Sequence, residues 1–83
     1  MLGMKYVVYD DDSFSIFPQI INHNDMRIMG KSPVSAGFLI IRKCEGERID
    51  VSCGGESLSL GLKSNGKIDE EIIKVGFLIS GMV

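Results

Sequence analysis

The stretch Val34-Ser35-Ala36-Gly37-Phe38-Leu39-Ile40-Ile41-Arg42 gives the strongest strand signal in this 83-residue chain and decides its fold. Its centre, Gly37–Ile41, is apolar at every side-chain position. A strand that is apolar on both faces belongs in the middle of a sheet. We therefore take residues 34–42 as the central strand and work outward from it.

On the carboxyl side of this strand, Arg48–Cys53 alternates polar and apolar residues without a break. Such alternation is typical of a half-buried strand, and it places Cys53 on the inward face. Glu45–Glu47 is a turn, so the two strands form a hairpin. Ser57–Leu62 alternates again, with its three leucines on one face, and this pattern predicts a fifth strand.

On the amino side, Tyr6–Tyr9 is β-branched and aromatic, and Phe14–Phe17 alternates after the polar turn Asp10–Ser13. These features predict a first hairpin. Pro18 ends its second strand, because proline cannot donate to a ladder of hydrogen bonds.

The next segment predicts a short helical turn. Asn22–Asp25 is rich in side chains that bond to nearby backbone, which suits a turn or a helix N-cap. Asp25–Met29 follows as one or two helical turns, and Gly30 is expected to end them.

The last segment has two interpretations. The apolar residues that recur at helical spacing are Ile68, Ile72, Val75 and Ile79. Together with the acids of Asp69–Glu71, which suit a helix start, they predict an amphipathic helix. The alternative takes Asn65-Gly66 as a hairpin turn and Gly76–Ile79 as a strand.

These elements predict an α+β fold of one domain, residues 1–83. Four or five antiparallel strands form its sheet, the C-terminal helix packs on one face, and the short helical turn follows the second strand. A small, partly open all-β barrel with a helical plug is the alternative architecture.

Composition bounds the function. Hydrophobic residues make up 45% of the chain and charged residues 24%, an ordinary globular mixture. Proteins that bind the phosphate backbone of nucleic acids carry excess positive charge. The net charge of this chain is −2, so no nucleic-acid partner is expected. The N-terminus has no targeting pattern and no apolar run could span a bilayer, which predicts a cytoplasmic protein without a membrane partner.

No motif for a metal or a cofactor is present. The acidic run Asp10–Asp12 does not continue as a calcium-binding loop, because Phe14 occupies a ligand position. Cys44 and Cys53 are too far apart in sequence for a zinc pair, and the chain has one histidine. Both thiols are expected to be unpaired.

Three side chains are candidates for a small-ligand pocket: His23, Asp25 and Cys53. A thiol with an imidazole makes a nucleophilic dyad, so a minor enzyme is conceivable on these residues. The competing interpretation makes His23 a hydrogen-bonded structural residue that fixes its turn, and Cys53 a buried core residue.

The mean hydropathy of +0.19 is high for so short a chain, and a small sphere has little interior. The last residues stay apolar, so some of them are expected to contact another molecule. The candidate interface residues are Phe77, Leu78, Met82 and Val83, with completion of the core as the alternative. We therefore predict a non-enzymatic interaction module that acts as a homo-oligomer, with a dimer favoured and another protein as the alternative partner.

Three segments, His23–Met26, Ser35–Phe38 and Ser57–Leu62, give the chain a resemblance to uncharacterised small bacterial proteins of mobile DNA, of the integron gene-cassette or prophage type. The resemblance implies a compact accessory protein and supplies no activity or catalytic residue.

Overall fold

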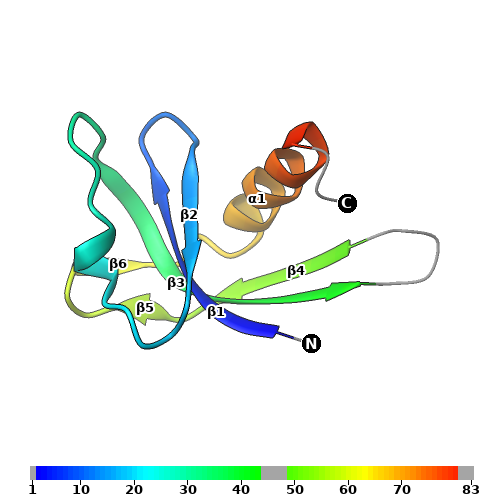
Figure 1. Cartoon of the computed structure of the whole chain (residues 1–83), viewed down its shortest axis with the longest axis horizontal. Helices are drawn as coiled ribbons and strands as arrows, with labels where there is room; N and C mark the ends of the chain where they lie inside the picture. The colour runs from blue at the N-terminus through cyan, green and yellow to red at the C-terminus, as the bar shows by residue number, and fades with distance from the viewer. Residues whose placement is uncertain (1, 44–48, 81–83) are drawn as a thin grey trace.

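The protein consists of a four-stranded antiparallel sheet and one long helix (Figure 1). The structure is a computed structural model, and it describes residues 2–43 and 49–80. The elements in chain order are β1 Leu2–Tyr9, β2 Phe14–Phe17, the 3-10 helix η1 His23–Met26, β3 Pro33–Lys43, β4 Ile49–Gly54, β5 Glu56–Ser57, β6 Leu62–Lys63 and α1 Lys67–Ser80. The predicted α+β class is confirmed, and the barrel alternative does not apply because the sheet is open.

The strand predicted to be central lies between two neighbours, in the order β2-β1-β3-β4. β3 pairs with β1 over most of its length and with β4 beyond Gly37. The strands from β1 to β4 match the predicted ones to within a few residues. The predicted turn Glu45–Glu47 lies outside the described residues.

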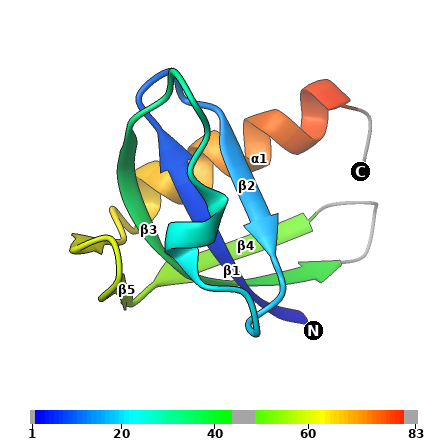
Figure 2. The ribbon, with the colours of Figure 1, turned by 60° about the vertical axis from the view of Figure 1, so that its left-hand side comes forward.

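The sheet separates two apolar clusters, because successive side chains of a strand point to opposite faces. Tyr6 and Val8 of β1 point to the first cluster, beneath α1, and Val7 and Tyr9 point to the second. The second cluster is covered by the segment around η1 and by the connection from β5 to β6 (Figure 2).

The prediction of a fifth strand over Ser57–Leu62 is wrong. Two short strands, β5 and β6, pair with each other, and a turn separates them. The Ser57 hydroxyl accepts the Leu60 N–H at 3.2 Å, and Gly61 has a φ of +68°, which L side chains rarely adopt. The alternation of serine and leucine therefore serves a turn that leaves Leu58 exposed.

The predicted C-terminal helix is confirmed and continues to Ser80, so the alternative strand over Gly76–Ile79 is wrong. α1 buries Asp69, Ile73 and Phe77, and of the residues that predicted the helix Ile72 is half-buried and packs against the same cluster. Of the predicted stripe, Ile68 is 65% exposed and Val75 is 48% exposed.

The short helical turn after β2 is present, but it begins earlier than predicted. η1 spans His23–Met26, and Arg27 is already extended. Gly30 therefore does not end a helix. It has a φ of +83° in the next turn, between Ile28 and Lys31.

Candidate functional site

A hydrogen-bonded carboxylate connects α1 to the sheet. The side chain of Asp69 is fully buried and accepts three hydrogen bonds, from the Tyr6 hydroxyl at 2.6 Å, the Ser35 hydroxyl at 2.8 Å and the Asn65 N–H at 2.9 Å. The last of these caps the start of the helix, where orphan N–H groups need acceptors. A buried carboxylate is tolerated only when it is bonded in this way.

Tyr6 contributes to this cluster as a donor. Burial raises the pKa of its phenol above the ordinary value of 10.0, and the hydrogen bond to Asp69 raises it further. Because a phenol has one proton, which Asp69 receives, the Ser64 hydroxyl at 2.6 Å donates to the phenol oxygen. The cluster is internally satisfied, which indicates a structural role.

Cys53 lies beside the same cluster on β4. Burial raises the pKa of its thiol to about 12, and the charges of Glu70 and Asp69 add to the effect. The Glu70 carboxylate also accepts the Cys53 backbone N–H at 3.1 Å. A thiol that stays protonated at neutral pH is a poor nucleophile. Cys53 is half-buried and packs against the apolar cluster beneath α1, and Cys44 lies outside the described residues.

His23 is buried and fixes η1 to the sheet. Its Nε2 lies 2.8 Å from the Gly37 carbonyl oxygen, and since a carbonyl can only accept, Nε2 carries the proton. The ring also meets Phe17 and Phe38 edge to face, with centroids 5.4 and 5.7 Å away. These contacts agree with the structural interpretation of this histidine.

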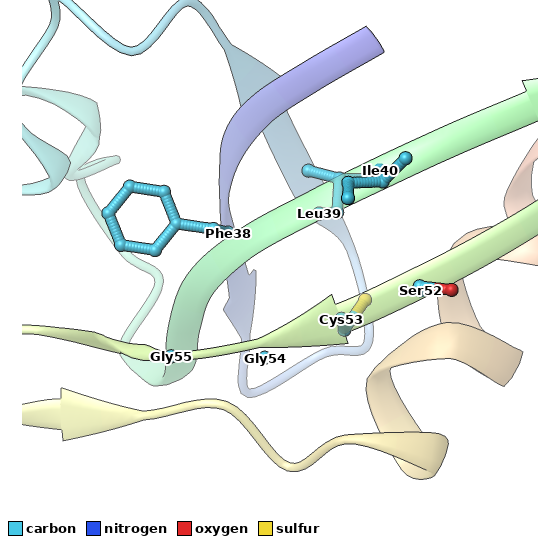
Figure 3. Close-up of a pocket in the computed structure, with 7 residues that line it drawn as sticks. All are labelled: Phe38, Leu39, Ile40, Ser52, Cys53, Gly54 and Gly55. Atoms are coloured by element: carbon cyan, nitrogen blue, oxygen red, sulfur yellow. The ribbon is translucent and has the colours of Figure 1, made fainter. Parts of the chain in front are cut away.

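The three predicted ligand residues do not share a cleft. Cys53 lines a shallow cleft of about 310 Å³ on β3 and β4 (Figure 3). Its lining residues are Phe38, Leu39, Ile40, Ser52, Cys53, Gly54 and Gly55. His23 reaches it only through the ring of Phe38, and Asp25 is exposed on η1.

A second hollow lies between the β1–β2 turn and α1, and we call it the α1 groove. Its volume is about 420 Å³, and its lining residues are Asp12, Phe14, Glu71, Ile72, Val75 and Gly76. A Cβ built on Gly76 would lie 2.3 Å from the Phe14 ring, so glycine permits this close approach. The groove has an apolar floor and two carboxylates.

The groove adjoins an apolar stripe on the outer side of α1. Ile68, Ile72 and Val75 follow each other at helical spacing, and the sheet leaves them exposed or half-buried. We call these three residues the outer stripe. Their helical spacing is visible in the sequence, but the sequence does not show that Ile68 and Val75 lie at the surface while Ile72 packs against the core.

Of the predicted interface residues, two lie in α1 and two lie outside the described residues. Phe77 is 9% exposed, and its ring packs edge to face against Phe14, so it completes the core. Leu78 is part of α1. Met82 and Val83 lie outside the described residues.

Within residues 2–43 and 49–80, no group of three or more His, Cys, Asp or Glu side chains could hold a metal ion. No helix in the same residues is long and apolar enough to cross a bilayer. No protein-family model, no curated protein and no solved structure matches this chain.

Proposed function

We propose that this protein is a non-enzymatic interaction module that works as a homo-oligomer, with a dimer favoured. The observation that carries the proposal is the outer stripe of α1 with the groove beside it. A helix of a small domain normally directs its apolar stripe to the core. Here the core takes Asp69, Ile73 and Phe77, with Ile72 packed at its edge, and Ile68 and Val75 of the stripe are left at the surface.

Isoleucine and valine side chains of the outer stripe are in contact with water. Removing one such side chain fully from water stabilises an assembly by about 1.5–3 kcal/mol. Ile68 is 65% and Val75 is 48% exposed, so a partner on this face has apolar area to cover. Contiguous exposed apolar patches on small proteins mark interaction sites.

The alternative function is a small-ligand binder or minor enzyme with a pocket near His23. The cleft of Figure 3 favours it, since about 310 Å³ is at the lower end of ligand pockets. Its lining offers one side-chain hydroxyl, of Ser52, while the Cys53 side chain packs against the cluster beneath α1. This lining offers little to bind or transform a polar substrate, so we favour the interaction module.

We further propose a cytoplasmic accessory protein that binds neither nucleic acid nor membranes, of the kind found on bacterial mobile DNA. A net charge of −2 supports the first of these exclusions, because binding to phosphate backbone depends on releasing counterions with positive side chains. Binding of random DNA or RNA at micromolar concentration, with a steep salt dependence, would contradict it.

Sedimentation equilibrium on the intact chain tests the proposal. We expect a dimer at micromolar concentration, and Val75→Thr should weaken association about tenfold because it places a hydroxyl in the apolar contact. Val34→Thr is the matched control, since Val34 is 47% exposed but lies on β3. A monomer mass across a wide concentration range would overturn the proposal.

A further inference from the structure

We infer that the α1 groove binds the loop Arg27-Ile28-Met29 of a second copy of this chain, in a two-fold contact. The inference rests on the proposed function and specifies its interface.

The loop holds apolar side chains out in solvent. Met29 is 99% exposed and Ile28 is 42% exposed. The Lys31 N–H donates to the Ile28 carbonyl at 3.1 Å, and Gly30 between them has a φ of +83°, as a type II turn requires. The chain therefore makes a defined turn whose tip is a methionine, a side chain that adapts well to apolar pockets.

Both ends of the loop are fixed to the body of the protein. At one end, the Tyr9 hydroxyl donates to the Met26 carbonyl. At the other, the Lys31 ammonium lies 3.1 Å from the Asp11 carboxylate and donates to the Ser13 hydroxyl at 2.8 Å. A loop that is ordered before binding loses less conformational entropy on association.

The charges of the loop and the groove are opposite. The groove combines an apolar floor with the carboxylates of Asp12 and Glu71. The loop combines apolar side chains with the guanidinium of Arg27, whose Nε donates to Asn24 at 2.8 Å. Its two terminal nitrogens still have donors for a carboxylate of the second copy.

The positions of the loop and the groove suit a two-fold axis. Both flank the β1–β2 turn at one end of the molecule, the loop through Lys31 and Asp11 and the groove through Asp12 and Phe14 (Figures 1 and 2). In an isologous contact each copy contributes the same surface. Two such ends that face each other can place each loop in the other groove.

A charge exchange tests the ionic part. R27E and E71R should each weaken association about tenfold, and the double variant R27E/E71R should recover most of the loss, because the pair is restored with reversed sign. R42E and E56R are the matched controls for net charge, since Arg42 and Glu56 are exposed and lie outside the groove. Circular dichroism checks that each variant is folded.

A second pair of variants tests the apolar part. Met29→Gln keeps the length of the side chain and should weaken association about tenfold. Leu58→Gln is the control, because Leu58 is 87% exposed in the turn between β5 and β6. In addition, with both native cysteines replaced by serine and with oxidised glutathione as the oxidant, a mixture of the M29C and V75C variants should form a disulfide-linked heterodimer faster than either variant links to itself.

The outcomes separate this inference from the proposed function. A dimer that is weakened by Val75→Thr but not by R27E or Met29→Gln would pair through α1 itself, which overturns the loop contact and keeps the homo-oligomer. A dimer in which the charge exchange recovers nothing also overturns it. A monomer at all concentrations overturns both proposals.

Discussion

The two sides of α1 differ in the groups that they contact. The inner side carries Asp69, Ile73 and Phe77, with Ile72 packed at its edge, and it buries a carboxylate although Ile68 and Val75 were available. The outer side carries no buried polar group, and Ile68 and Val75 are left at the surface. Apolar content alone therefore does not decide which side of this helix packs on the sheet.

Hydrogen bonding explains which side of α1 faces the sheet. Tyr6 and Ser35 point their hydroxyls toward the helix from β1 and β3, and a buried hydroxyl without a partner is unfavourable. With Asp69 inward, both hydroxyls and the Asn65 N–H have an acceptor. The rotation of α1 follows the polar groups of the sheet, and the apolar stripe then becomes available to a partner.

The largest effect is expected from Asp69→Ala. The substitution leaves the buried hydroxyls of Tyr6 and Ser35 without their acceptor, at about 1–3 kcal/mol each, and it also removes the acceptor of the part-buried Asn65 N–H. We expect the free energy of unfolding to fall by about 4 kcal/mol, measured by urea denaturation. The control Lys67→Ala, at an exposed position of the same helix outside the groove, should change it by about 0.5 kcal/mol or less. A loss below about 1 kcal/mol for Asp69→Ala would show that the cluster does not orient the helix.

Ile73→Ala compared with Ile68→Ala contrasts the two sides directly. Ile73 is fully buried, so truncation leaves a cavity and should cost about 3 kcal/mol. The same change at Ile68, which is 65% exposed, should alter the stability of the monomer by about 0.5 kcal/mol or less. Denaturation at a concentration where the protein is monomeric measures both. Equal losses would contradict the assignment of inner and outer sides.

Alkaline pH should lower the free energy of unfolding through Cys53 and Tyr6, which lie on the sheet beneath the inner side of α1. The folded pKa of Cys53 is about 12 against an ordinary 9.0, and that of Tyr6 is also raised, so folding favours the protonated forms. The stability from these groups is fully present below pH 9 and is lost as the pH rises toward 12. Cys53→Ala should make this decline shallower. An equally steep decline in that variant would remove the thiol from the explanation.

The smallest effect is expected from Gly76→Ala, between the two sides. Alanine normally stabilises a helix by about 1 kcal/mol relative to glycine. At this position the new Cβ would lie 2.3 Å from the Phe14 ring, so the ring must move and overpacking outweighs the gain. We expect a net loss of about 1 kcal/mol by thermal or urea denaturation. A net gain in the free energy of unfolding would mean that the Phe14 ring moves aside without loss of packing.

Much of this fold could be predicted from local patterns. The central strand, its hairpins and the helix have signals within ten or so residues, and β3 and α1 were found from those signals. The segment Ser57–Leu62 was misjudged because alternation fits a turn with a serine cap as well as a strand. What distinguishes them is the left-handed backbone of Gly61, which alternation does not encode.

The candidate site was less predictable for a physical reason. The spacing of Ile68, Ile72 and Val75 reveals the outer stripe. The direction in which the stripe points depends on Asp69, which is held by donors on β1 and β3. Those partners are distant in sequence. Conversely, Phe77 was expected at an interface because it is near an apolar end, yet Phe14 covers it from β2.

The hydrogen bond between Tyr6 and Asp69 also has a consequence for how the chain folds during synthesis. It joins residues 63 positions apart, on the first strand and the last helix. Chains emerge from the ribosome at about 5–20 residues per second, so β1 exists for several seconds before α1 does. During that interval the sheet face that α1 later covers, including Tyr6, Val8 and Leu39, is without its helix. The nascent chain therefore passes through a stage at which chaperone binding would protect it and a pause in translation would expose it to aggregation.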